Sequence, residues 1–186
     1  MGSYIFTDME IDAIGEISNI CLGSSASTLS MLVRHTVDIT PPKVEIVEKS
    51  EYTKNVSSKK VFVKVNYVEG VKGCSILMLE EHDAKAIADL MMGSDGNGDF
   101  AKMELGELHI SAVSEAMNQM MGAAATAMSV MLERKTDIST PILSIVLSYS
   151  CIPITLVRQS VTFSLSRRQK RRKISNKWVQ RIERRD

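Results

Sequence analysis

Glutamate and asparagine occur twice in this sequence at the same spacing, and the chemistry open to them is limited. The stretch DAIGEISN and the later stretch SAVSEAMN pair Glu16 and Asn19 with Glu115 and Asn118. An asparagine amide is not an acid, a base or a nucleophile at neutral pH, but it can hold a water molecule through one donor and one acceptor. The pair therefore suits a reaction in which the partner carries the metal and the leaving group, such as phosphoryl transfer with an oriented water.

Other residues that commonly carry chemistry are not spaced for it. No histidine, cysteine or serine suggests a catalytic triad, and no glycine-rich phosphate loop is present. We expect His35, His82 and His109 to be structural or solvated. The loop SDGNGD at 94–99 begins like a calcium-binding loop, but Phe100 takes its sixth position and no glutamate takes its twelfth. We therefore expect a solvated turn.

Each Glu–Asn pair falls within a helical pattern of apolar residues. The first helix should begin after Thr7, which fits a capping box with Glu10, and end near His35, before two prolines. The second helix should run from about 104 to 135. Five methionines at helical spacing predict an apolar core face on the second helix: Met117, Met120, Met121, Met128 and Met131.

On an ideal helix with about 3.6 residues per turn, the motif residues line one ridge and the apolar stripe lies opposite. The predicted ridges are Asp12, Glu16, Asn19 and Gly23, and Ser111, Glu115, Asn118 and Gly122. The predicted buried stripes are Ile14, Cys21, Ser25 and Leu32, and Val113, Met120, Ala124 and Met131. A solvated helix face is the plain alternative, because Glu and Asn usually lie at the surface. The repetition weakens that alternative, since solvated positions accept many residue types.

An internal duplication extends well beyond the two pairs. Residues 12–42 align without a gap with residues 111–141, at an offset of 99. Nine of the 31 aligned positions are identical: Ala13/Ala112, Glu16/Glu115, Asn19/Asn118, Gly23/Gly122, Ala26/Ala125, Ser30/Ser129, Asp38/Asp137, Ile39/Ile138 and Pro42/Pro141. The duplication predicts a single pseudo-symmetric domain.

Strand-like runs and a short helix lie between the two long helices. The predicted strands are 43–49, 59–68 and 73–79. The second of them alternates, with Val61, Val63, Val65 and Tyr67 on one face. A helix should follow at 82–93, so the chain mixes helices with a sheet.

Length and composition favour one globular domain. The chain has 186 residues, of which 44% are apolar, and its apolar runs are far shorter than the roughly 20 residues of a membrane span. No secretory signal opens the sequence. Cys21, Cys74 and Cys151 are widely spaced without a CxxC pair, which favours buried, reduced thiols over disulfides or zinc ligation. We therefore expect a cytosolic protein.

Charge is distributed unevenly along the chain. Residues 1–141 have a net charge of −8 and residues 142–186 a net charge of +9, with ten of the basic residues at 167–186. This division predicts an acidic body with a disordered basic tail. A tail that binds nucleic acid is a less favoured alternative, which predicts an affinity that falls steeply with salt.

The motif spacing resembles that of a known family. The pattern (D/S)-x3-E-x2-N-x22-P occurs as Asp12/Glu16/Asn19/Pro42 and again as Ser111/Glu115/Asn118/Pro141. This pattern is similar to the motif of the CheC–CheX–FliY family of chemotaxis phosphatases. The stretches NYVEGVKGCSILMLEE and IADLMMGSDGNGD look most like the CheC-like domain of the FliY members, which are flagellar motor switch proteins. The resemblance covers roughly residues 8–141.

The resemblance implies hydrolysis of the aspartyl phosphate on the response regulator CheY. In this family the motif asparagine places the attacking water and the motif glutamate grips a lysine of CheY. Carried over, Asn19 and Asn118 would orient the water, and Glu16 and Glu115 would dock CheY. The supporting motif positions would be Asp12, Ser111, Pro42 and Pro141. Magnesium would belong to CheY, so no cofactor or metal is expected on this chain.

The resemblance also implies a fold and a setting. The expected fold is α/β (α+β), a single pseudo-two-fold CheC-like domain with a central antiparallel sheet and two symmetry-related motif helices outside it. The domain would span 1–166, with repeat one at about 8–95, repeat two at about 104–166 and a basic tail at 167–186. Expected partners are phosphorylated CheY and flagellar switch proteins at the cytoplasmic face of the basal body. The alternative is a non-catalytic switch component that binds these proteins through the same helices.

The sequence departs from the family pattern after Pro141. Repeat symmetry predicts strands there that match residues 43–79, with charged residues on an exposed face. Residues 141–166 instead carry one charged residue, Arg158, ahead of the arginine-rich run. We interpret the departure as an altered reading frame or another artefact in the sequence, a hypothesis that resequencing would reject by returning the same tail.

Overall fold

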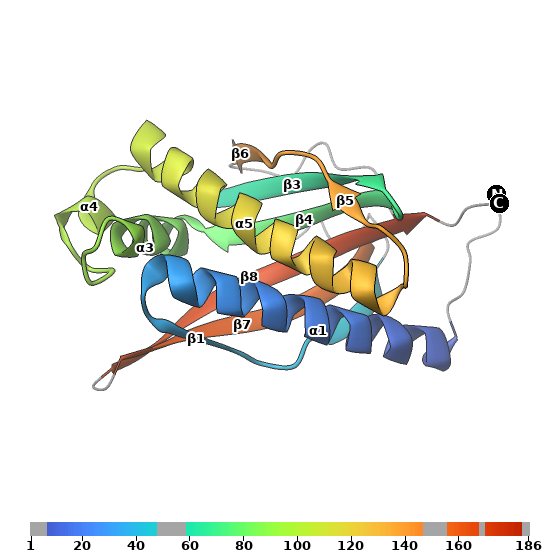
Figure 1. The fold of residues 1–186 in the computed structure, drawn as a ribbon. Helices are drawn as coiled ribbons and strands as arrows, with labels where there is room; N and C mark the ends of the chain where they lie inside the picture. The colour runs from blue at the N-terminus through green and yellow to red at the C-terminus, as the bar shows by residue number, and fades with distance from the viewer. Residues whose placement is uncertain (1–6, 48–58, 147–155, 168–169, 184–186) are drawn as a thin grey trace.

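An antiparallel sheet and the helices on one of its faces make up the fold (Figure 1). The computed structural model describes residues 7–47, 59–146, 156–167 and 170–183. The helices are α1 (Asp8–Val33), α3 (Glu81–Met91), α4 (Asp99–Lys102) and α5 (Glu107–Met131). The strands are β1 (Thr36–Ile39), β2 (Lys43–Val47), β3 (Lys60–Glu69), β4 (Lys72–Glu80), β5 (Asp137–Ile138), β6 (Ile142–Val146), β7 (Leu156–Arg167) and β8 (Lys170–Glu183).

The order of the strands follows the sequence repeat. The path through the sheet is β1-β7-β8-β4-β3-β5, with β2 also pairing β7 and β6 also pairing β3. The offset of 99 residues relates β1 to β5, β2 to β6, β3 to β7 and β4 to β8. Because β4 and β8 are neighbours at the centre, a pseudo-two-fold axis relates the two halves of the sheet. The predicted fold class is confirmed.

The C-terminal part of the chain differs from the expected disordered tail. We placed residues 167–186 outside the fold because of their charge, but Lys170–Glu183 form β8 between β4 and β7. A strand between two neighbours has its backbone donors and acceptors paired on both edges. Strand β7 likewise forms where repeat symmetry predicts it, despite the unusual composition of that stretch.

The two long helices begin with equivalent caps. At α1, the Glu10 N–H donates to Thr7 Oγ1 at 3.3 Å and the Thr7 N–H donates to Glu10 Oε2 at 2.9 Å, so the predicted capping box is confirmed. At α5, the Gly106 N–H donates to Nδ1 of His109, the repeat counterpart of Glu10, at 3.2 Å. The other ring nitrogen of His109 lies 2.8 Å from the Phe100 carbonyl. His109 is therefore structural, and its cap starts α5 later than predicted.

The core lies between these helices and the sheet. Its most deeply buried members include Leu22, Leu29, Val33, Val61, Val63, Leu77, Leu79, Ile87, Met117 and Met120. Four of the five methionines predicted for this face are buried, but Met131 is 41% exposed because α5 ends there. Ile14 and Leu32 are half-buried rather than buried. Among the described helices, none combines the length and apolar character that a membrane span requires.

Candidate functional site

Helices α1 and α5 lie side by side and run in opposite directions (Figure 1). The Ser24 hydroxyl donates to the Ala123 carbonyl at 3.3 Å, and the Ser25 hydroxyl donates to the Met120 carbonyl at 3.0 Å. Ser24 and Ala123 are repeat counterparts. The pseudo-two-fold axis therefore passes close to this contact, and the small side chains let the two helix backbones approach each other.

The predicted ridges lie at the surface of these two helices. Asp12, Glu16 and Asn19 are exposed on α1, and their counterparts Ser111, Glu115 and Asn118 are exposed on α5. Gly23 and Gly122, one turn after each asparagine, are partly exposed. The predicted position of the ridges is thus confirmed, whereas the chemical role of their residues stays a prediction.

The two asparagines belong to separate sites. Asn19 lies five residues before Ser24, and Asn118 lies five residues before Ala123. Because the helices are antiparallel, these intervals extend in opposite directions from the contact. At about 1.5 Å per residue, the two amides are roughly 15 Å apart along the helices. One small reacting group cannot contact both amides at once.

The described part of the chain supplies few partners for these side chains. Within it, no hydrogen bond or ion pair is found for Glu16, Asn19 or Asn118. Glu115 differs, because its Oε1 accepts a hydrogen bond from the Gln119 side-chain amide one turn later. The repeat counterpart of Gln119 is Ile20, which cannot donate such a bond. We did not predict this difference from the sequence, although the alignment places Ile20 opposite Gln119.

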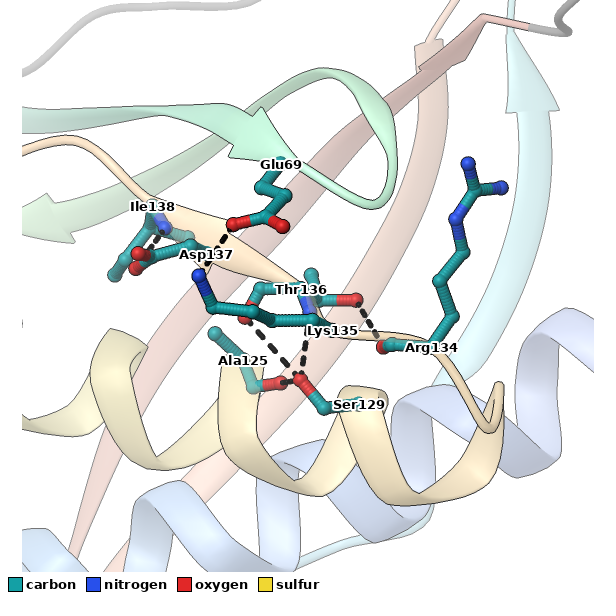
Figure 2. Close-up of polar contacts among 8 residues, drawn as sticks. All are labelled: Glu69, Ala125, Ser129, Arg134, Lys135, Thr136, Asp137 and Ile138. Carbon is teal, nitrogen blue, oxygen red and sulfur yellow. Dashed lines mark hydrogen bonds and ion pairs between the residues drawn. The ribbon is translucent and has the colours of Figure 1, made fainter.

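Other identities between the repeats have an internal explanation. The Ser129 hydroxyl donates to the Ala125 carbonyl at 2.8 Å and accepts from the Thr136 N–H at 2.8 Å (Figure 2). The Ser30 hydroxyl makes the same two contacts, with the Ala26 carbonyl at 2.8 Å and the Val37 N–H at 2.9 Å. The repeated serines therefore join each long helix to the segment that follows it.

The repeated prolines lie away from the ridges in the chain. Pro42 and Pro141 are half-buried and come directly before β2 and β6. They lie between the first and second strands of each repeat, β1 and β2 or β5 and β6, which is a structural position. The repeated glutamates and asparagines are the ridge identities for which the described residues supply no contact shared by both repeats. The carbonyls of Gly23 and Gly122 each accept a hydroxyl hydrogen bond at 3.0 Å, from Ser27 and Thr126, but a backbone carbonyl of any residue could accept it.

Cys21 lies between the asparagine and the glycine of the first ridge but faces the interior. It is 1% exposed, and burial raises the pKa of its thiol to about 11. The thiol is therefore protonated at neutral pH and is a poor nucleophile. Cys74 is also buried and free, as predicted, while Cys151 lies outside the described residues. Across the described ranges, no three His, Cys, Asp or Glu side chains are grouped to hold a metal ion.

Comparison with known sequences matches both repeats. A model of the CheC-like family matches residues 9–46 and 108–145, which are related by the same offset of 99. Over 135 residues the chain is 52% identical to the flagellar motor switch phosphatase FliY of Bacillus subtilis (strain 168). That match covers 73% of this chain and 35% of the relative, so the chain spans about a third of the relative's length.

Comparison with solved structures matches the whole fold. The crystal structure of Thermotoga maritima FliY superposes with a TM-score of 0.81 at 35% identity, over 95% of this chain and 91% of that chain. The chemotaxis protein CheX from Desulfovibrio desulfuricans gives 0.63 at 18% identity, over 90% and 99%. The FliM middle domain from H. pylori gives 0.67 at 13% identity, over 95% and 94%. The last two likenesses concern the fold alone.

Proposed function

The chain belongs to the CheC-like family, and on that premise we propose that it is a phosphatase that hydrolyses the aspartyl phosphate of the response regulator CheY. One observation carries the proposal. A Glu–Asn pair is repeated on two exposed ridges, and no contact found within the described residues accounts for the repetition. The name of the Bacillus subtilis relative, a flagellar motor switch phosphatase, supports the same reaction class.

Asn19 and Asn118 would orient the attacking water at the two sites. Each amide can accept from one water proton and donate to another acceptor, so it fixes the direction of the water's lone pair. Attack forms a bond from the water oxygen to phosphorus and breaks the bond from phosphorus to the aspartate oxygen. The products are the free carboxylate and inorganic phosphate, which takes up the water's protons or releases one to solvent. Orientation by an amide needs no general base on this chain.

Glu16 and Glu115 would dock a lysine of CheY. Each glutamate lies three residues before its asparagine, and side chains at that separation are neighbours on a helix surface. An exposed ion pair contributes only about 0–1 kcal/mol. The carboxylate would therefore set the register of the partner over the amide more than it would hold the complex together. Asp12 and Ser111, one turn earlier, would support the docked position.

The remaining requirements fall on the partner and the setting. Magnesium, which neutralises the transferred phosphoryl group, would be bound by CheY, so the chain itself would need no cofactor. We place the protein with flagellar switch proteins at the cytoplasmic face of the basal body. The name of the Bacillus subtilis relative supports that setting.

The test is the decay of phosphate on purified CheY with magnesium, with and without this chain. We expect the chain to accelerate the decay and the Asn19→Ala/Asn118→Ala variant to lose the acceleration while it still binds CheY. Asn97→Ala is the matched control, because Asn97 is an exposed asparagine in the loop between α3 and α4.

Two results would contradict the proposal. One is a double variant that hydrolyses the phosphate as fast as the unchanged chain. The other is a folded chain that binds CheY and leaves its phosphate untouched, which would instead support the non-catalytic switch component.

A further inference from the structure

Gly23 and Gly122 occupy equivalent places one turn after each asparagine, inside α1 and α5. A Cβ atom built on either glycine would meet no atom of the described residues within 4 Å. Neither glycine has a positive φ, so the backbone conformation does not require glycine at these positions. Neither packing against the described residues nor backbone conformation explains why a side chain is missing twice at the same place.

Other glycines in the chain have an internal reason. Gly70 has a φ of +84°, and a Cβ there would lie 2.2 Å from the Lys135 carbonyl oxygen. A Cβ at Gly98 would lie 2.3 Å from the Ser94 hydroxyl oxygen. Inside a helix, glycine is less stable than alanine because its backbone loses more freedom on folding. Gly23 and Gly122 therefore destabilise their helices relative to alanine, and no packing contact among the described residues requires glycine there.

We propose that Gly23 and Gly122 are the positions of closest approach between this chain and its phosphorylated partner. The absence of a side chain lets the partner's surface lie against the helix backbone beside the asparagine. The inference rests on the proposed function and adds a determinant of specificity to each of its two sites.

The short side chain of asparagine explains why the position one turn later must not carry a side chain that projects toward the partner. Its side chain is short, and the partner's phosphate is attached to a folded domain rather than to a free small molecule. Side chains four positions apart on a helix are neighbours, with Cβ atoms about 5–6 Å apart. A methyl group at Gly23 would therefore stand beside the Asn19 amide and hold the partner's surface away from it. Gly122 has the same relation to Asn118.

The variant Gly23→Ala/Gly122→Ala tests the inference without threatening the fold. Alanine favours the helix, and the added methyl group meets open space, so the melting temperature should stay the same or rise. Gly15→Ala is the matched control in the same helix. A Cβ there would lie 3.5 Å from Val44 Cγ2, an ordinary contact, and its counterpart Ser114 already carries a side chain.

Affinity should be measured with phosphorylated CheY and magnesium, and each glycine change should be made in the Asn19→Ala/Asn118→Ala chain. Overpacking of a close contact should weaken binding about tenfold or more, while Gly15→Ala leaves the affinity unchanged. The inference is overturned if the double glycine variant binds within about twofold of its parent, a difference of about 0.4 kcal/mol. It is also overturned if the melting temperature falls, which would show an internal role.

The rate of phosphate decay with the unchanged chain is measured in a separate experiment from the affinities. A failure of the proposed chemistry would appear as phosphate decay that does not depend on Asn19 and Asn118. The comparison of affinities between the glycine variants still decides the close-approach inference in that case.

Discussion

Gln119 makes the second Glu–Asn pair chemically different from the first. Its amide donates to the Glu115 carboxylate, whereas Ile20 occupies the equivalent place beside Glu16. The amide occupies one oxygen of the Glu115 carboxylate, so a lysine of the partner meets a partly engaged acceptor at the second site and a carboxylate without this bond at the first. The two sites share the same glutamate and asparagine but should therefore differ in docking strength.

Exchanging Ile20 and Gln119 should exchange the docking strengths of the two sites. In an Asn19→Ala chain, where only the second site works, Gln119→Ile should lower the KM for phosphorylated CheY by about two- to tenfold, the equivalent of one net hydrogen bond. In an Asn118→Ala chain, Ile20→Gln should raise the KM by a similar factor. Unchanged KM values in both chains would show that the hydrogen bond of Gln119 does not compete with docking.

Cys21 should make stability depend on alkaline pH. Its folded pKa is raised from 9.0 to about 11 by burial, so the folded state holds the thiol proton more tightly than the unfolded state. The contribution is complete below about pH 9 and is lost as pH rises toward about 11, for a total of roughly 2–3 kcal/mol. Urea unfolding across this range should show a falling free energy of unfolding, and Cys21→Ala should flatten the fall. A slope that is unchanged in Cys21→Ala would assign it to other groups.

At the scale of elements, the junctions between each long helix and the next strand are built alike. Ser30 and Ser129 each bond the carbonyl of the preceding turn and accept the N–H of the residue seven positions later. Arg34 and Glu133, four residues after each serine, both have positive φ values, of 52° and 48°. The repeat thus preserves a turn as well as two helices.

Removing either serine hydroxyl should destabilise the protein to a similar extent. Ser30→Ala leaves the Val37 N–H without its acceptor, and Ser129→Ala does the same to the Thr136 N–H. Each change should cost about 1–2 kcal/mol, the range for a partly buried donor left unpaired. Thermal or urea unfolding measures both variants. A neutral effect at one serine and a large effect at the other would contradict the equivalence of the two junctions.

Sequence periodicity predicted the long elements better than the short ones. The capping box of Thr7 and the outward position of Glu16 and Asn19 followed from spacing alone. The two-residue strand β5 and the four-residue helix α4 were missed, because such short segments contain no full period. The capping role of His109 was not predicted, although extending the alignment by two residues matches it to the capping residue Glu10.

At the scale of the whole molecule, repeat symmetry was a better guide than composition. The charge of residues 170–183 favoured a disordered tail, but the offset of 99 assigns this segment to the counterpart of β4. The sheet needs that strand, since β8 joins the β7 side of the sheet to β4. The inequality of the two sites was only partly visible in the sequence, because the alignment pairs Ile20 with Gln119 but does not show that Gln119 reaches Glu115.

The same symmetry makes the two candidate sites independent parts of one molecule. Their asparagines lie on opposite sides of the contact between Ser24 and Ala123, roughly 15 Å apart along the helices. Changes at positions that far apart and without shared partners usually add. Each site should therefore contribute its own share of the phosphatase rate.

The most direct test is the rate of CheY phosphate decay with the unchanged chain, Asn19→Ala, Asn118→Ala and the double variant, all at limiting CheY. We predict that the accelerations of the two single variants sum to that of the unchanged chain and that the double variant gives none. Complete loss of activity in either single variant would contradict two independent sites. Full activity in the double variant would contradict the role of the asparagines altogether.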